Sequence, residues 1–416
     1  MNDMKITAQN TFVAYHEFLR IGSTQLKNRI LKSIADKIES NRKTLIEANN
    51  KDLRAGEKAG LTSAFLDRLA LNEKRIQGMI QACHDIVMLA DPVGQIFDMV
   101  VRPQGFKVGR MRVPIGVIGI IYEARPNVTI EAATLCLKSG NGVILRGGSH
   151  AFHSNMALVA LLQEALKDND VNPHLISYVD SKDRAAVEAM LIQDEYIHLI
   201  IPRGGEGLIR SVVEKSRIPV LKHYKGVCHV YIHEQADPDM AVKIALNAKV
   251  QRPAVCNSAE TLLIDETVAK HLLPGLVAEY QKKGVEIRGC EQTRSLIPSV
   301  KTASEEDYYA EFLDLILAVK IVRNIDDAIT HINKYGSAHT DAIITENLHA
   351  ANQFLNNVDS ASVMINASTR LSDGGLYGLG AEIGISTDKL HARGPMGLEG
   401  LTTYKWIVMG EGHIRE

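Results

Sequence analysis

Apolar residues recur at helical spacing through the first ninety positions. They return every four positions from 26 to 38 behind Ser23, which predicts an amphipathic helix capped by that serine. A second apolar face, from 76 to 87 behind Asn72, predicts another helix. Cys83 falls on this face, so we expect it in the core, where a buried thiol behaves as a small hydrophobe.

The pattern changes after residue 95. Two short strands, 96–101 and 106–113, are predicted to pair across the turn Pro103-Gln104-Gly105. Apolar strands then alternate with helices. Strands are expected at 116–122, 142–146, 175–179, 198–202 and 218–223, and helices at 128–139 (closed by Gly140), 156–166 and 184–192. This alternation predicts a parallel sheet covered on both faces, with ligands at the carboxyl ends of its strands.

A second series of the same kind is expected from about residue 227. Its strands are predicted at 261–264, 285–289, 315–322, 341–345 and 362–366, its helices at 238–249, 268–282, 326–333 and 348–356, and a last strand at 403–410. The predicted fold class is therefore α/β, with two Rossmann-like parallel-sheet domains.

Composition excludes several classes of function. The 416 residues include 47 Lys and Arg against 49 Asp and Glu, a formal net charge of −2, which leaves no basic excess for binding nucleic acid. The longest apolar stretch, 113–122, is about half a membrane span, and no signal peptide is expected. Five cysteines without metal-type spacing predict a reduced, cytoplasmic protein with no metal site.

Two glycine turns follow predicted strands. They are Arg146-Gly147-Gly148-Ser149 and Pro202-Arg203-Gly204-Gly205. Such glycines let backbone amides approach a phosphate, and the next helix N-terminus favours negative charge. The pattern GEG at 205–207 lacks the third glycine of the dinucleotide fingerprint, so simple tight turns are the alternative.

Cys256 lies in the polar segment QRPAVCNSAE (251–260), between a predicted helix and a predicted strand. A loop on a rigid scaffold is where nucleophiles are usually displayed. No activating base is adjacent in sequence, so a half-buried structural cysteine remains the alternative.

Four long segments, at 113–133, 251–263, 322–343 and 367–406, together resemble the gamma-glutamyl phosphate reductases. These form a phosphate-dependent branch of the aldehyde dehydrogenase superfamily. The resemblance implies an NADPH-binding domain (1–95 and 113–226), a catalytic domain (227–366) and a small β oligomerisation arm (96–112 and 395–416). It also implies a homo-oligomer, a dimer or tetramer.

The resemblance also implies roles for single residues. Cys256 matches the nucleophile, and Asn127 matches the oxyanion-hole asparagine that acts with the Cys256 backbone N–H. Glu311, followed by Phe312, matches the glutamate that holds the nicotinamide ribose. Arg146 stands where relatives carry a lysine on the adenosine ribose. Ser149 replaces the carboxylate that would repel a 2′-phosphate, which favours NADP(H).

The general base of hydrolytic relatives is missing, because the matching segment is KHYKG (222–226). Substrate contacts are expected in the matched loops. The candidates are Arg125, Arg252, Thr369, Arg370 and Ser372, which offer cations and hydroxyls for a phosphorylated anion. For each arginine, a structural bridge between loops is the alternative.

The function expected from the resemblance is NADPH-dependent reduction of L-glutamate 5-phosphate to the 5-semialdehyde through a cysteine thioacyl intermediate. This is the second step of proline biosynthesis, and the resemblance also implies functional coupling with glutamate 5-kinase. The alternative is a cysteine acyltransferase or hydrolase that pairs Cys256 with His223 and needs no nicotinamide cofactor.

Overall fold

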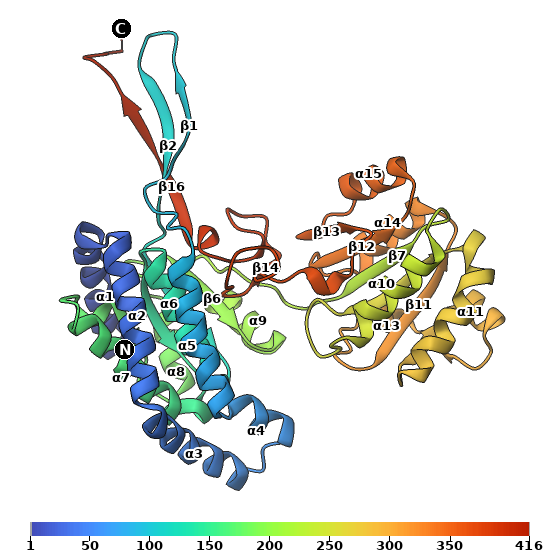
Figure 1. Ribbon diagram of the computed structural model, residues 1–416, viewed down its shortest axis with the longest axis horizontal. Helices are drawn as coiled ribbons and strands as arrows, with labels where there is room; N and C mark the ends of the chain where they lie inside the picture. The colour runs from blue at the N-terminus through green and yellow to red at the C-terminus, as the bar shows by residue number, and fades with distance from the viewer. Residues whose placement is uncertain (1, 416) are drawn as a thin grey trace. The chain divides into compact units, whose positions relative to one another are not determined.

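The computed structural model describes residues 2–415, which form two compact units (Figure 1). Unit 1 takes in the described residues up to Lys222, with Gly378–Gly384 and the chain from Leu390 onward. Unit 2 consists of His223–Tyr377 and Ile385–Lys389. The outer limits of the expected domains, residues 1 and 416, lie outside the described part.

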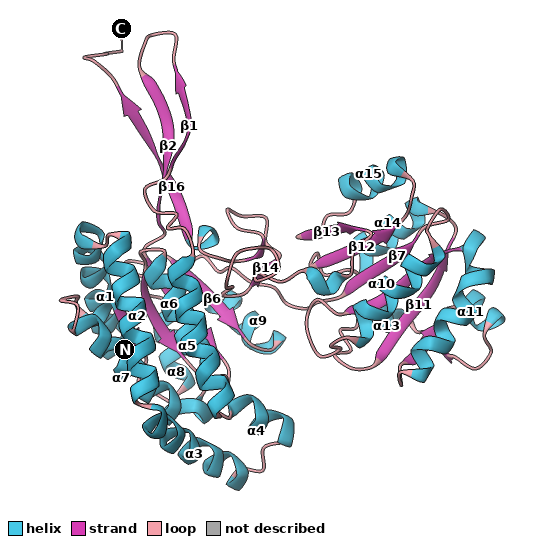
Figure 2. Cartoon of the chain, viewed as in Figure 1, coloured by secondary structure: helices cyan, strands magenta, loops and turns pink. Residues whose placement is uncertain are grey.

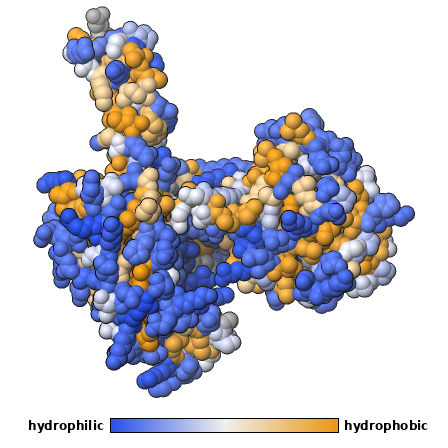
Figure 3. Space-filling model, in the orientation of Figure 1, coloured by the Kyte–Doolittle hydropathy of each residue, from blue (hydrophilic) through white to orange (hydrophobic). Residues whose placement is uncertain are grey.

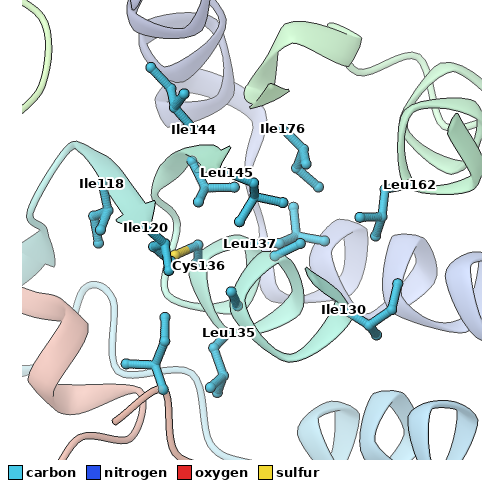
Figure 4. Packing of buried hydrophobic residues seen from close by; sticks show 14 of the residues in the cluster. Ile118, Ile120, Ile130, Leu135, Cys136, Leu137, Ile144, Leu145, Leu162 and Ile176 are labelled. Carbon is cyan, nitrogen blue, oxygen red and sulfur yellow. The ribbon is translucent and has the colours of Figure 1, made fainter. Parts of the chain in front are cut away.

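Unit 1 is built on a four-stranded parallel sheet in the order β5-β4-β3-β6. The strands are β3 (Val117–Tyr122), β4 (Gly142–Arg146), β5 (Ile176–Tyr178) and β6 (Leu199–Arg203). Every residue of β3 and β4 is buried, because helices cover both faces of the sheet. Figure 4 shows Ile120 and Leu145 of the sheet packed near Leu137 of the neighbouring helix.

The described part of unit 1 contains nine α-helices. They are α1 (Asn2–Ile21), α2 (Thr24–Ser40), α3 (Arg42–Lys58), α4 (Ser63–Leu69), α5 (Glu73–Met88), α6 (Asn127–Lys138), α7 (Phe152–Lys167), α8 (Arg184–Leu191) and α9 (Glu206–Lys215). The predicted cap at Ser23 is confirmed, because Ser23 accepts the Leu26 N–H at 3.2 Å. Asn72 caps α5 in the same way and accepts the Arg75 N–H at 2.9 Å. Cys83 is fully buried, as expected.

Unit 2 contains a seven-stranded parallel sheet in the order β10-β9-β11-β8-β7-β12-β13. Its strands are β7 (Cys228–Ile232), β8 (Ala259–Asp265), β9 (Glu286–Gly289), β10 (Lys301–Thr302), β11 (Ile316–Val322), β12 (Thr340–Ile344) and β13 (Ser362–Ile365). Its α-helices are α10 (Pro238–Val250), α11 (Glu266–Lys282), α12 (Glu291–Leu296), α13 (Glu305–Tyr308), α14 (Ile325–Tyr335) and α15 (Leu348–Asn357). The predicted α/β class is confirmed in both units.

Three strands of unit 1 form a separate antiparallel sheet, here called the arm (Figure 2). They are β1 (Ile96–Val101), β2 (Lys107–Pro114) and β16 (Thr402–Met409), in the order β1-β2-β16. The arm exposes large apolar side chains, among them Val101 (67% exposed), Trp406 (64%) and Val408 (64%). Figure 3 shows apolar surface on the arm.

One predicted strand is absent. Residues 218–223 do not form a strand: only Val220 makes an isolated bridge, to Ile200. Pro219 accepts the Ile200 N–H at 2.9 Å but has no N–H of its own to extend the ladder. Conversely, β7 was not predicted, although it lies near the centre of the unit 2 sheet.

Two further strands, β14 (Ile385–Ser386) and β15 (Gly394–Pro395), are short. Among residues 2–415 no helix combines the length and the apolar character needed to cross a bilayer.

Candidate functional site

The carboxyl ends of the unit 1 strands border a cleft of about 550 Å³. Of the residues predicted to bind the cofactor, Arg146, Gly148 and Ser149 line it. The other predicted cofactor residues do not line this cleft, but they belong to the ends of β4 and β6 or to the turns that follow. They are Gly147, Pro202, Arg203, Gly204 and Gly205. The predicted relation between strand ends and a ligand-sized cleft is therefore present in unit 1.

The turn after β4 requires glycine. A Cβ on Gly147 would lie 2.1 Å from Asn155 Nδ2, closer than any contact allows. Arg146 donates to the Gly147 carbonyl oxygen at 2.9 Å and is nearly buried. Burial lowers the pKa of the Arg146 guanidinium. The Arg146 side chain therefore stabilises the turn by binding the Gly147 backbone, and it also lines the cleft.

A buried polar network lies beneath this turn. Tyr122 and Thr129 share a hydrogen bond of 2.7 Å, Thr129 donates to Asn155 Oδ1 at 3.0 Å, and Asn155 donates to Tyr178 at 3.3 Å. Since a satisfied buried network fixes its members in place, it holds Asn155 against Gly147.

The second turn wraps around a carboxylate. Glu123 accepts the Gly205 N–H at 3.2 Å, and its own N–H donates to the Arg203 carbonyl at 3.1 Å. A Cβ on Gly204 would lie 2.7 Å from the Glu123 carboxyl carbon. The helix α9 begins directly after this turn, and its N-terminus favours an anion.

Three cations in the cleft were missed by the sequence analysis: Lys182, Arg184 and Lys215. Lys215 is paired with Glu188, whereas Lys182 lies 4.8 Å from the centre of the Phe152 ring. Lys182 and Arg184 follow β5, so the rule that ligands gather at strand ends could have found them. Glycine turns, a helix N-terminus and cations fit a dinucleotide with its phosphates.

In unit 2, Cys256 lies on the loop between α10 and β8 and is half-buried. A Cβ on Gly226 would lie 1.9 Å from the Cys256 carbonyl oxygen. The Cys228 thiol donates to the same oxygen at 3.2 Å, and Glu311 accepts the Gly226 N–H at 2.8 Å. Gly226 therefore contacts both the predicted nucleophile, Cys256, and the predicted ribose ligand, Glu311.

The loop after Glu311 is also fixed. Leu313 has a φ of 53°, which is unusual for a side chain of its size, and its N–H donates to Glu260 at 3.3 Å. The Arg288 guanidinium lies over the Phe312 ring, with its central carbon 5.2 Å from the centre of that ring.

The predicted substrate residues of unit 2 converge near Cys256. Arg370 donates to Gln251 at 2.9 Å, and burial, with Arg252 nearby, lowers the pKa of Arg370. The Ser372 carbonyl accepts from Asn257 at 2.8 Å. Thr369 is fully buried, and its hydroxyl has no hydrogen-bond partner in the described structure.

The remaining predicted residues belong to other segments of the chain. Arg125 is exposed and Asn127 half-buried at the start of α6, both in unit 1. His223 is half-buried, and its Nδ1 lies 3.0 Å from the Ile385 carbonyl oxygen. Within residues 2–415, no three His, Cys, Asp or Glu side chains form a group that could hold a metal ion.

Comparison with known proteins identifies the family. The group described as "Aldehyde dehydrogenase family" matches residues 8–310. The "Gamma-glutamyl phosphate reductase" of Thermodesulfovibrio yellowstonii is 56% identical over 399 residues, which covers 96% of both chains.

Solved structures agree with this result. Gamma-glutamyl phosphate reductase from Thermotoga maritima is 48% identical, with a TM-score of 0.97 over 99% of this chain and 100% of that chain. An acetylating aldehyde dehydrogenase from Geobacillus thermoglucosidasius, 17% identical, shares the fold with a TM-score of 0.70 over 100% of this chain and 98% of that chain. The chain therefore belongs to the aldehyde dehydrogenase family and, within it, to the gamma-glutamyl phosphate reductases.

Proposed function

We propose that this protein reduces L-glutamate 5-phosphate to L-glutamate 5-semialdehyde and phosphate with NADPH, the second step of proline biosynthesis. The observation that carries the proposal is the 56% identity, over 96% of the chain, to a protein named for this activity. The half-buried loop position of Cys256 supports it, because a nucleophile must be both held and reachable.

The chemistry is assigned to residues of this chain. The Cys256 thiolate attacks the acyl carbon, the carbon–oxygen bond to phosphate breaks, and a thioacyl group remains on the sulfur. A bound nicotinamide would supply the hydride for this thioester, and the hemithioacetal formed on Cys256 would collapse to the aldehyde and the thiolate. The Asn127 amide and the Cys256 backbone N–H stabilise the oxyanion, and one such donor contributes about 3 kcal/mol.

The family uses a nicotinamide cofactor, and we propose NADP(H) for this chain. Ser149 places no carboxylate in the cleft, whereas Lys182 and Arg184 add positive charge there, which suits a 2′-phosphate. Glu311 and Phe312 are assigned to the nicotinamide ribose. The assigned cofactor residues of unit 1 are Arg146, Gly147, Gly148, Ser149, Pro202, Arg203, Gly204 and Gly205.

Five residues are proposed as substrate contacts: Arg125, Arg252, Thr369, Arg370 and Ser372. The hydrogen bond from Arg370 to Gln251 also fits the alternative of a bridge between loops. The unpartnered Thr369 hydroxyl supports a role for this segment in binding a polar ligand.

We propose residues 1–95 and 113–226 as the cofactor domain, 227–366 as the catalytic domain, and 96–112 with 395–416 as the oligomerisation arm. The apolar side chains exposed on the arm favour contact with a second copy of the chain, in a dimer or tetramer. A cytoplasmic location and functional coupling with glutamate 5-kinase, which would supply the acyl phosphate, complete the proposal.

The test is the reverse reaction with L-glutamate 5-semialdehyde, phosphate and NADP. Phosphate-dependent formation of NADPH is expected, and Cys256→Ala should abolish it, whereas Cys290→Ala should not. Acyl transfer or hydrolysis without any nicotinamide requirement would instead support the cysteine hydrolase alternative.

A further inference from the structure

A second hollow, of about 490 Å³, lies in unit 1 where α5 and α6 pack side by side (Figure 1). Asn127, the first residue of α6, and Glu131, one helical turn later, line it together with Lys74 and Arg75 of α5. None of these residues except Asn127 was singled out by the sequence analysis. Because the proposed oxyanion donor lines this hollow, the hollow can receive the part of the substrate attached to the reacting carbonyl.

The hollow offers one carboxylate and one uncommitted cation. Glu131 is half-buried and accepts a hydrogen bond from the Asn127 amide at 2.8 Å. Arg75 is already committed, because it donates to the Ala70 carbonyl at 2.7 Å and pairs with Asp67 at 3.0 Å. Lys74 is exposed, and no ion pair involves it among the residues that the structure describes.

We propose that this hollow binds the α-amino-acid end of the substrate, with Glu131 receiving the α-ammonium and Lys74 the α-carboxylate. The proposal rests on the proposed function, since it specifies how the same reaction selects an amino acid. A carboxylate and an ammonium in one half-enclosed hollow are complementary to a zwitterion, and charge-assisted hydrogen bonds of this kind are stronger than neutral ones.

The two groups on α6 lie close enough together to contact one substrate molecule. The Asn127 amide nitrogen and the Glu131 carboxylate oxygen are 2.8 Å apart, on neighbouring turns of the helix. In the proposed substrate, four bonds separate the reacting carbonyl carbon from the ammonium nitrogen. A chain of this length can reach from a carbonyl oxygen at the Asn127 amide to the Glu131 carboxylate.

Glu131 also has a positioning role that the test must separate from binding. Its carboxylate holds the Asn127 amide, so removing the side chain would disturb the oxyanion donor as well. Glu131→Gln keeps an oxygen that can accept this hydrogen bond and removes only the negative charge. A loss of activity that occurs only with substrates that carry the ammonium group therefore reports on binding of that group and not on the placement of Asn127.

The experiment measures oxidation of three aldehydes with NADP and phosphate. They are L-glutamate 5-semialdehyde, 5-oxopentanoate, which lacks the amine, and 4-aminobutanal, which lacks the carboxylate. Each variant is compared with the unmodified enzyme on the same aldehyde, so that differences in cyclisation between the aldehydes cancel. Where an analogue is not turned over, its inhibition constant against the semialdehyde is used in the same way.

Glu131→Gln is expected to lower kcat/KM at least tenfold for the two amines, mainly through KM, and to leave 5-oxopentanoate within twofold. Lys74→Ala should weaken the two carboxylates and leave 4-aminobutanal unchanged, and Lys51→Ala, on the exposed surface of α3, should change none of them. Equal losses on all three aldehydes with Glu131→Gln would overturn the proposal and leave Glu131 a positioning residue only. If the unmodified enzyme shows no phosphate-dependent activity with the semialdehyde, the proposed function itself fails.

Discussion

The Lys249 ammonium and the Glu260 carboxylate lie 2.6 Å apart, and both side chains are fully buried. Lys249 is near the end of α10 and Glu260 is in β8, so the pair closes the base of the loop that carries Cys256. Glu260 also accepts the N–H of Leu313 at 3.3 Å. One buried ion pair therefore fixes both the nucleophile loop and the segment that follows Glu311.

Breaking this pair from one side should destabilise the protein strongly. Lys249→Met leaves a buried carboxylate without its cation, which costs about 3–5 kcal/mol of unfolding free energy. Lys249→Met combined with Glu260→Gln should recover much of this loss, because the glutamine oxygen can still accept the Leu313 N–H. Urea unfolding of Lys249→Met, Glu260→Gln and the double variant measures the coupling, and additive losses would show that the two side chains do not depend on one another.

Gly226 cannot be replaced without moving the nucleophile loop. Its missing Cβ position lies 1.9 Å from the Cys256 carbonyl oxygen, so Gly226→Ala forces the backbone apart. We expect kcat to fall more than tenfold and the thermal midpoint to drop.

Gly275 provides the matched control, since it lies inside α11 and, apart from its chain neighbours and the backbone of its own helix, no atom lies within 4 Å of its Cβ position. Gly275→Ala should stabilise the protein by about 0.5–1 kcal/mol and keep full activity. An active and equally stable Gly226→Ala protein would contradict the close approach.

Much of this arrangement follows from local patterns. The helices capped by Ser23 and Asn72 could be predicted because caps and apolar periodicity lie within one segment. The candidate nucleophile Cys256 could be placed on a loop for the same reason. Its assignment as the nucleophile came from the resemblance and not from periodicity.

The features that were missed depend on contacts between distant segments. The strand β7 contains His229, a polar residue whose fully buried ring donates to Asp341 at 2.8 Å, 112 positions later in the chain. The requirement for glycine at 226 comes from Cys256, thirty positions later. Glu131 was overlooked because its importance arises from its hydrogen bond with Asn127, although the spacing of four residues was visible.

Buried neutral histidines should make the protein sensitive to acid. Burial lowers the pKa of His331 to about 2 and that of His339 to about 3, against 6.5 for the free side chain. Lys320 donates to His331 Nδ1 at 3.2 Å, which requires the neutral ring. Below pH 6.5 these histidines bind protons in the unfolded chain but not in the folded chain. The stability that they contribute is therefore fully present above pH 6.5, and the free energy of unfolding falls as the pH decreases below that value.

Each such histidine contributes a slope of about 1.4 kcal/mol per pH unit. His331→Gln should flatten the pH dependence of urea unfolding between about pH 6 and 5 by this amount, whatever its effect at neutral pH. His84→Gln, at an exposed position of α5, should leave the slope unchanged. Parallel profiles for the His331 variant and the unmodified protein would show that this ring titrates normally in the folded state.

The last prediction concerns release of the thioacyl group in the oxidative direction. Hydrolytic aldehyde dehydrogenases activate water with a carboxylate base, but the matching segment here is KHYKG (222–226). The Ile385 carbonyl accepts from His223 Nδ1 at 3.0 Å, which commits one ring nitrogen to the backbone. Phosphate is already anionic and needs no strong base, so turnover should depend on phosphate and hydrolysis should be slow. We expect His223→Glu to raise the phosphate-independent rate with semialdehyde and NADP. If the unmodified enzyme turns over equally fast without phosphate, the argument from the missing carboxylate is wrong. If only the glutamate variant stays inactive, the phosphate dependence stands, and His223 does not occupy the position of the lost base.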